Sequence, residues 1–326
     1  MSKGILVSGV KPSGVIHIGN YFGALKQFVD LQNEYECRLF VANLHALTTV
    51  HDAKKLHEQS LGIVLDFLAI GIDPSKATIF LQSDVPHVTE LSWIFESLTT
   101  MPYLMRAHAF KDAEAKSKEI NVGVFNYPML MSADILVHDA SVVPVGQDQK
   151  QHIEIARDTA EKFNRTFGET FVLPNPLIIE SVATVVGTDG QKMSKSYNNI
   201  IPLFATDSEI EKAVMGIPTD SKGVNDPKDP DNDTVFKLHT LVTPSATLED
   251  LRARYEDGKV GYKESKEILI DSLKKFIGPL REKRNEWENK PEEVEKIIRE
   301  GGEKMRKIVH EKMIEIREKT GLIHHN

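Results

Sequence analysis

The chain has a single cysteine, Cys37, among its 326 residues. One cysteine cannot make an internal disulfide framework, a cysteine-rich zinc site or an iron–sulfur cluster, so we expect none of these. Cys37 stands just before the apolar pair Leu39-Phe40, and we therefore interpret it as a small buried hydrophobic residue. The sequence also suggests no metal site built from protein ligands alone.

Long apolar runs are lacking as well. No stretch approaches the roughly 20 apolar residues that a helix needs to cross a bilayer, and the first residues lack the cleavage site of a signal peptide. We therefore expect a cytoplasmic protein without a membrane partner. A basic excess is missing too, since the net charge is −8. This charge disfavours indiscriminate nucleic-acid binding, and we expect no DNA partner, although a local basic face could still bind one RNA.

Short apolar runs alternate with amphipathic stretches in the first half of the chain. We expect strands at residues 5–10, 39–42, 78–81 and 141–145, and helices at residues 21–31, 56–70, 88–98 and 148–163. Strands separated by helical segments of this length imply βαβ crossovers and a parallel sheet.

Strand patterns disappear from about residue 200 onward. Residues 218–233 are polar and rich in turn-forming residues. Helices are expected at residues 248–255, 262–276, 279–287 and 291–319, the last with an apolar stripe that is interrupted at Gly301-Gly302. The sequence therefore predicts an α/β protein: a Rossmann-like parallel-sheet catalytic domain (1–200) followed by an all-helical domain (201–326) whose last helix packs back.

Ligands of open parallel sheets bind beyond the carboxyl ends of the strands. The first such loop, residues 11–20 (KPSGVIHIGN), matches neither the Walker A motif nor the GxGxxG pattern. Its final HIGN stands at an expected helix start, where Gly19 lets a ligand approach the backbone, and His17 and Asn20 can donate hydrogen bonds to phosphate oxygens. A capped strand-to-helix turn with a surface histidine is an equally good interpretation of this loop alone.

A second polar loop, residues 187–196 (GTDGQKMSKS), carries two lysines and two serines. Two ammonium groups on such a loop suit the neutralisation of a departing pyrophosphate. A single basic loop is usually only a solvated turn. Together, however, HIGN at 17–20 and KMSKS at 192–196 resemble the paired signatures of class I aminoacyl-tRNA synthetases, the second at all five positions.

A third segment, residues 145–152 (VGQDQKQH), runs from a strand into a helix. Gly146 permits close approach of a ligand to the backbone. Asp148, at the carboxyl end of the strand, can accept hydrogen bonds from both hydroxyls of a ribose. An acidic helix N-cap is the alternative interpretation of Asp148.

Three segments narrow the resemblance: residues 12–20, 131–136 (MSADIL) and 143–152 (VPVGQDQKQH) look like the bacterial tryptophanyl-tRNA synthetase family. Asn20 replaces the final histidine of the general class I signature, a substitution common in this family. The resemblance covers essentially the whole chain. It implies L-tryptophan, ATP with Mg²⁺ and tRNA(Trp) as ligands, a homodimer, and a helical domain that binds the tRNA anticodon.

Tyr127, Met131 and Asp134 are spaced i, i+4 and i+7, which on a helix would place them on one face. A carboxylate beside an aromatic ring and a thioether offers an apolar slot for an indole, and the resemblance gives Asp134 the role of accepting the indole N–H. Phenylalanine in that slot would leave Asp134 buried and unpaired. Taken without the family, Tyr127 and Met131 fit a core position as well.

The resemblance assigns further residues by their positions in these motifs. It brings Val7, His45, Val143 and Val145 to tryptophan. It brings to ATP Lys11, Pro12, Ser13, Gly19, Asn20, Gly146, Gln147, Asp148, Val185, Lys192, Met193, Ser194, Lys195 and Ser196. The expected catalytic residues are His17, Asn20, Lys192 and Lys195, which would stabilise charge while the tryptophan carboxylate attacks the α-phosphorus of ATP.

Three alternatives stay open at the level of sequence. Tyrosyl-tRNA synthetases share the fold and both nucleotide motifs but differ at residues 131–136. Other nucleotidyltransferases use similar loops but lack the helical extension. A non-catalytic paralogue that binds tryptophan or RNA is expected to lose loop glycines or lysines, whereas Gly19, Gly146, Lys192 and Lys195 are present.

Overall fold

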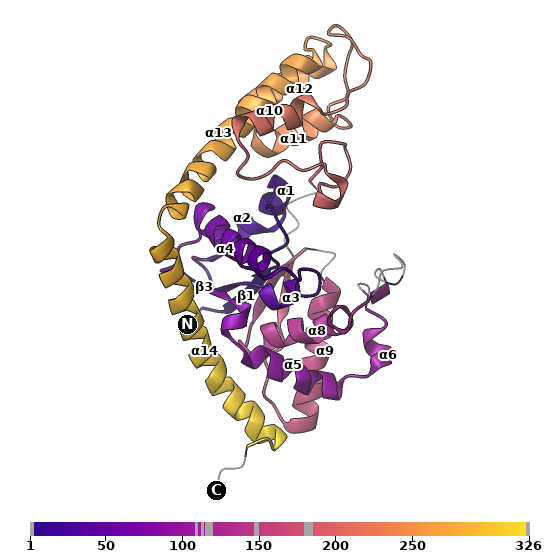
Figure 1. Ribbon diagram of the computed structural model, residues 1–326. Coiled ribbons are helices and arrows are strands. Elements are labelled where there is room, and N and C mark those ends of the chain that lie inside the picture. Colours follow the sequence, from indigo (N-terminus) through magenta and orange to yellow (C-terminus); the bar gives the residue numbers. More distant parts are fainter. Residues whose placement is uncertain are drawn as a thin grey trace. The chain divides into compact units, whose positions relative to one another are not determined.

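The computed structural model describes residues 3–107, 110–111, 114, 120–146, 150–178 and 185–323. The chain folds into two compact units, each assembled from separate segments (Figure 1). Unit 1 comprises Met1–Gly14, Phe28–Ile179 and Lys290–Asn326, and unit 2 comprises Val15–Gln27 and Glu180–Asn289. The expected division into a catalytic and a tRNA-binding domain near residue 200 concerns function and stays a prediction.

Unit 1 is built on a parallel sheet of five strands in the order β3-β2-β1-β4-β5. The strands are β1 (Ile5–Val10), β2 (Glu36–Val41), β3 (Ala77–Leu81), β4 (Val142–Val145) and β5 (Asn175–Ile178). The predicted parallel sheet is confirmed. Strand β5 was not predicted, because its segment contains Pro176 and resembles a loop; a proline is tolerated there because β5 lies at the sheet edge.

Helices surround this sheet within unit 1. They are α3 (Asn43–Ala46), α4 (Ala53–Ala69), α5 (His87–Leu98), α6 (Met101–Leu104), α8 (Val122–Leu136), α9 (Lys150–Phe167) and α14 (Pro291–Thr320), with a 3-10 turn η2 (Gln82–Asp84). Cys37 is fully buried on β2, as expected. Within the described part of the chain, no helix is both long and apolar enough to cross a membrane.

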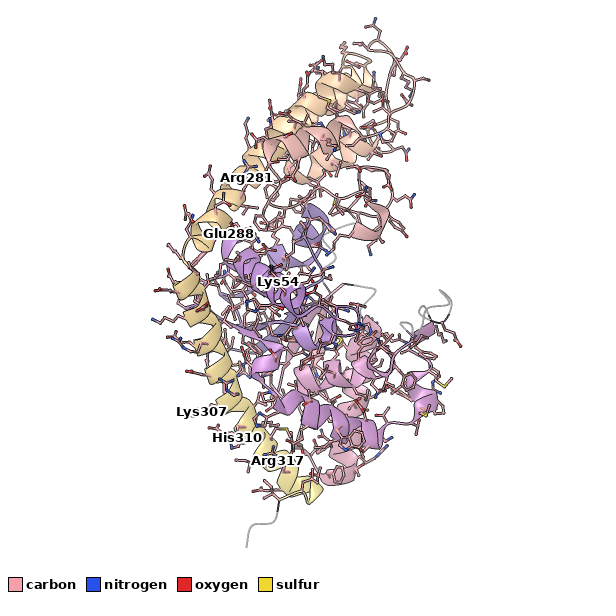
Figure 2. The ribbon with its side chains drawn as sticks, in the orientation of Figure 1. Lys54, Arg281, Glu288, Lys307, His310 and Arg317 are labelled. Carbon is pink, nitrogen blue, oxygen red and sulfur yellow. The ribbon has the colours of Figure 1, made fainter. Side chains whose placement is uncertain are left out.

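Helix α14 packs against β3 and α5 (Figure 1). The helix runs without a break through Gly301 and Gly302. Both glycines are buried, so the buried face of the helix continues across the gap in the apolar stripe. A Cβ atom on Gly301 would lie 1.9 Å from the carbonyl oxygen of Ile79, so only glycine lets the helix touch the strand this closely. Farther along α14, Arg317 donates two hydrogen bonds to Glu90 of α5 (Figure 2).

Unit 2 is predominantly helical. Its elements are α1 (Ile18–Asn20), the π-helix η1 (Tyr21–Leu25), the start of α2 (Lys26–Leu31), the 3-10 turn η4 (Lys195–Tyr197), α10 (Asp207–Met215), α11 (Thr234–Val242), α12 (Ser245–Glu256) and α13 (Tyr262–Glu288). Helices α10 and α11 were not predicted, although Thr206 and Glu209 form a capping box that marks the start of α10.

The expectation of two helices at 262–276 and 279–287 was wrong, because α13 continues through Pro279. Contacts beyond the proline attach the second half of the helix to residues 204–207. Arg281 donates hydrogen bonds to the carbonyl oxygen of Ala205 and to Asp207. The guanidinium of Arg284 lies 5.3 Å from the centre of the Phe204 ring. Tertiary contacts therefore compensate for the backbone donor that the proline lacks.

Candidate active site

Helix α8 carries the predicted tryptophan-binding residues Tyr127, Met131 and Asp134 in unit 1. The side chain of Asn121 caps its first turn by accepting from the N–H of Val124 at 3.0 Å. Asp134 is only 3% exposed, whereas Tyr127 and Met131 are half-buried. Helix α8 was not among the predicted helices, although the spacing of these three residues suits it. The role of their side chains in binding tryptophan stays a prediction.

The Asp134 carboxylate has two described partners, His45 and Gln82. His45 Nε2 lies 2.9 Å from Oδ2, and Gln82 Nε2 donates to Oδ1 at 2.9 Å and to Oδ2 at 2.7 Å. Burial raises the pKa of Asp134 above its usual range, and the hydrogen bonds from His45 and Gln82 oppose that rise. An ionised carboxylate accepts about four hydrogen bonds, so acceptor capacity is left for an incoming N–H.

Gln82 was missed by the sequence reasoning. It follows β3 directly and is 1% exposed. Its Oε1 accepts from the backbone N–H groups of Leu44 and His45 at 3.0 and 3.3 Å, which turns Nε2 toward Asp134. A polar residue immediately after a buried strand of a parallel sheet was the available signal.

His152 also belongs to this neighbourhood without having been predicted. The Tyr127 hydroxyl and His152 Nε2 are 2.7 Å apart, so α9 restrains the ring that α8 presents. The ring centres of Tyr127 and His45 lie 6.2 Å apart in an edge-on arrangement. Tyr127 is therefore held from two sides, which fixes the shape of the wall beside Asp134.

The aliphatic residues predicted to face tryptophan lie on two neighbouring strands. Val7 on β1 is 1% exposed and Val143 on β4 is 4% exposed, while Val145 is half-buried. All three belong to or pack against the main apolar cluster of unit 1. They are therefore core residues in this structure, and their contact with a ligand stays a prediction.

Two predicted ATP segments follow strands of unit 1. After β1, Lys11 Nζ donates to Thr48 Oγ1 at 3.0 Å, and burial lowers the pKa of this lysine. Pro12 is buried and Ser13 is exposed. After β4, Gly146 is exposed, whereas Gln147 and Asp148 lie outside the described residues.

The HIGN segment of unit 2 forms a reciprocal helix cap. The N–H of Asn20 donates to His17 Nδ1 at 3.3 Å, and the N–H of His17 donates to Asn20 Oδ1 at 3.2 Å. Burial, together with the positive charge of Lys195, lowers the pKa of His17 to about 4, so its ring is neutral at pH 7. Because Nδ1 is an acceptor, the ring proton lies on Nε2, which can donate to a phosphate oxygen.

The KMSKS loop of unit 2 exposes its charged residues and buries its apolar ones. Lys192, Lys195 and Ser196 are exposed, whereas Met193 is 4% exposed and the preceding Val185 is 8% exposed. Ser194 Oγ and Ser196 Oγ are 2.9 Å apart.

Both signatures therefore belong to one compact unit, as the close approach at Gly19 shows. A Cβ atom on Gly19 would lie 3.3 Å from the Cβ of Met193 and 2.9 Å from Nδ1 of His17. Glycine is needed here because any side chain would press on both. A neutral donor at His17 with the ammonium group of Lys195 near it forms a local arrangement suited to phosphate oxygens. Among the residues the structure describes, no three histidine, cysteine or acidic side chains gather as a metal site.

A parallel α/β sheet, a glycine-bearing HIGN turn and a KMSKS loop together define a nucleotide-binding protein of the class I synthetase type. In agreement, the family model described as tRNA synthetases class I (W and Y) matches residues 2–278. The chain therefore belongs to this family.

Comparison with individual proteins narrows the assignment. The tryptophan–tRNA ligase of Fusobacterium nucleatum is 48% identical over 318 residues, covering 97% of this chain and 98% of that protein. The tryptophan–tRNA ligase of Rhodopirellula baltica is 46% identical, covering 97% of this chain and 99% of that protein. The crystal structure of tryptophanyl-tRNA synthetase from Campylobacter jejuni complexed with ADP and tryptophan matches with a TM-score of 0.92 at 46% identity, covering 97% and 99%. Within the family, the chain is of the bacterial tryptophanyl-tRNA synthetase type.

Proposed function

We propose that this chain is a tryptophan–tRNA ligase, which activates L-tryptophan with ATP and transfers it to the 3′-terminal ribose of tRNA(Trp). The observation that carries the proposal is the buried Asp134 carboxylate, oriented by His45 and Gln82. It supplies one oriented acceptor on the helix face that also carries the Tyr127 ring, as an indole N–H requires. The family assignment and both nucleotide signatures support the same function.

In the proposed first step, a carboxylate oxygen of tryptophan attacks the α-phosphorus of ATP in line, and the bond to pyrophosphate breaks. Tryptophan needs no deprotonation for this, because its carboxylate is already ionised. The protein's contribution is positioning and charge stabilisation. The Nε2–H of His17 donates to phosphate oxygens, and Lys192 and Lys195 neutralise the negative charge that collects on the leaving pyrophosphate.

Mg²⁺ enters this proposal with ATP. Its preferred octahedral set is commonly completed by phosphate oxygens and water, so a protein cage is not required. The described residues fit that mode of binding, since the phosphate-facing groups at His17, Lys192 and Lys195 are donors and cations rather than carboxylates. When bound, the ion would help to stabilise charge on the phosphates.

The remaining ATP contacts are proposed from position in the sequence. They are Lys11, Pro12, Ser13, Gly19, Asn20, Gly146, Gln147, Asp148, Val185, Met193, Ser194 and Ser196. We likewise propose that Val7, Met131, Val143 and Val145 contact tryptophan. The helical region from residue 201 to residue 326 is the proposed anticodon-binding part, and a cytoplasmic location follows from a role in translation.

The experiment that tests the proposed function is amino-acid-dependent exchange of pyrophosphate into ATP, measured with each of the twenty amino acids. We expect tryptophan to stimulate exchange and tyrosine not to. Stimulation by tyrosine instead would overturn the tryptophan assignment, and absence of exchange with every amino acid would favour a non-catalytic binding protein.

Replacing Lys195 with alanine should lower kcat for exchange about 100-fold, because one charge that stabilises the departing pyrophosphate is removed. KM for tryptophan should change less than about threefold, since the proposed amino-acid pocket lies in unit 1. Lys237→Ala, on α11 of the same unit, is the matched control and should leave both constants near those of the unaltered protein. A normal kcat for Lys195→Ala would contradict the assigned role.

We propose that the homodimer forms through a surface of unit 1 around Trp93 and Met101, whose side chains are 69% and 67% exposed. Leu47 and Val122, 48% and 73% exposed, line one cavity together with Ser92, the neighbour of Trp93 on α5. His45 and Tyr127 of the proposed tryptophan site line the same cavity. Tryptophan and methionine are enriched at protein interfaces relative to the rest of the surface.

Sedimentation equilibrium of the unaltered protein should give twice the chain mass of 36.6 kDa. Trp93→Lys should shift the species to the single chain mass, because a buried unpaired ammonium disfavours the interface. Val224→Lys, which replaces an apolar residue of unit 2 that is 59% exposed, should remain dimeric. If the Trp93→Lys variant remained dimeric, the interface would have to lie elsewhere on the chain.

A further inference from the structure

Two backbone hydrogen bonds close the KMSKS loop of unit 2. The N–H of Gly187 donates to the carbonyl oxygen of Gln191 at 2.6 Å, and the N–H of Met193 donates to that of Val185 at 2.9 Å. These bonds join the two limbs of the loop at residues 185–187 and 191–193. They leave the backbone from Ser194 onward, including Lys195, to be fixed by something else.

The side chain of Asn199 fills that role in the structure. It is 2% exposed although it follows an exposed loop. Its Oδ1 accepts from the N–H of Ser194 at 2.7 Å. Its Nδ2 donates to the carbonyl oxygen of Lys192 at 3.1 Å and to Asp189 Oδ1 at 2.7 Å. One amide group therefore binds the loop at three points that lie on both sides of Met193.

The backbone of Asn199 adds a fourth connection, because its carbonyl oxygen accepts from the N–H of Thr188 at 2.9 Å. Asp189 is held in turn, since its Oδ1 also accepts from the N–H of Gln191 at 3.0 Å. Gly187 gives the amide its space: a Cβ atom there would lie 2.2 Å from Asn199 Nδ2. The buried site is therefore shaped around an asparagine side chain.

Only an amide satisfies this set of contacts. The site needs one acceptor and two donors on a short side chain, which asparagine provides. Aspartate has the same shape but no donor, and it would place oxygen against two oxygen atoms. Alanine would leave three polar groups without their buried partner.

We propose that Asn199 is a positioning residue for adenylate formation, which holds the backbone at Lys192 and Ser194 so that Lys192 and Lys195 meet the phosphates of ATP correctly placed. This inference rests on the proposed function. Binding of tryptophan should be independent of it, since Asp134 and its partners belong to unit 1. The expected signature is a loss in kcat with little change in the affinity for tryptophan.

Asn199→Asp is the principal test, in tryptophan-dependent exchange. We expect kcat to fall about 30-fold or more, because small misplacement of catalytic groups has large effects on rate. The dissociation constant for tryptophan, from equilibrium dialysis, should change less than about threefold. Asn198→Asp is the matched control: it adds the same charge at an exposed neighbour, whose left-handed backbone (φ 53°) aspartate tolerates. It should keep kcat within about threefold.

A second substitution tests the contact itself. In the Asn199→Asp background, Asp189→Asn places a donor opposite the new carboxylate but loses the acceptor for the N–H of Gln191. It should recover about threefold in kcat if the loop contact is what was lost. A kcat for Asn199→Asp within threefold of normal would overturn the inference. An equal loss of kcat in Asn198→Asp would also overturn it, because the effect would then come from the added charge alone. A loss of tryptophan affinity as large as the loss of kcat would overturn it as well.

Failure of the proposed function is distinguishable from failure of this inference. If the unaltered protein shows no tryptophan-dependent exchange, the proposed function fails. The loop contact can still be measured without ligands, by amide hydrogen exchange of residues 185–199. Asn199→Asp should speed hydrogen exchange at the N–H of Ser194, which donates to Oδ1 of residue 199. The reason is that aspartate cannot donate to Lys192 and Asp189, so the loop around this N–H is held less firmly. Unchanged protection there would overturn the positioning role on its own.

Discussion

Replacing Asp134 with alanine should lower kcat/KM for tryptophan activation about 10³-fold or more. The substitution removes the proposed acceptor of the indole N–H, and it also leaves the buried donors of His45 and Gln82 without their partner. Sites built to hydrogen-bond a substrate group reject analogues that lack it by about 10⁴-fold. The preference for tryptophan over phenylalanine should therefore fall by at least two orders of magnitude in pyrophosphate exchange.

The affinity for ATP should be largely retained, which separates this effect from unfolding. Asp158→Ala is the matched control, because Asp158 is an exposed carboxylate of unit 1 that accepts from the Tyr103 hydroxyl. It should keep both activity and discrimination. Unchanged discrimination in Asp134→Ala, with normal thermal stability, would refute the role assigned to this carboxylate.

Replacing Gly301 with alanine should destabilise the packing of α14 by about 3 kcal/mol or more. Two effects oppose each other at this position. Alanine favours a helix over glycine by about 1 kcal/mol. The added Cβ would lie 1.9 Å from the carbonyl oxygen of Ile79, and backbone cannot yield as a flexible side chain can. Overpacking of this kind usually costs about 1–3 kcal/mol and occasionally more, so the clash should prevail.

Hydrogen exchange of the α14 amides, read by mass spectrometry, measures this loss directly even if the two units unfold separately. Gly278→Ala is the matched control, because a Cβ on this glycine of α13 meets nothing within 4 Å. It should change the free energy of unfolding by less than about 1 kcal/mol, since Pro279 limits the gain in helix propensity. Equal protection of α14 in the two variants would show that the helix can shift away at little cost.

Features that depend on neighbouring residues in the chain were predictable. The parallel sheet follows from apolar runs at strand length separated by helical segments, and four of its strands were found that way. The class I signatures are contiguous, so their glycines and lysines could be recognised directly. Tyr127, Met131 and Asp134 follow the same rule, because helical spacing alone places them on one face.

Features that depend on partners distant in the chain could not be predicted from the sequence. The position of Gln82 after a buried strand marks it only as a possible site residue, and its partner Asp134, 52 positions away, becomes its neighbour only on folding. Asn199 looks like one of two loop asparagines, and only its burial against Gly187 distinguishes it from Asn198. Pro279 signals a helix end locally, yet contacts from Arg281 and Arg284 carry α13 past it.

By itself the sequence determined the α/β class, the positions of the HIGN and KMSKS signatures, and the carboxylate at Asp134. Short-range periodicity and contiguous motifs encode these features. Only the tertiary structure decided how the carboxylate is oriented by His45 and Gln82, and that both signatures belong to one unit. It also decided that the glycines of α14 are contact points. The physical reason is that hydrogen bonds and close packing act through space, between residues whose separation along the chain carries no periodic signal.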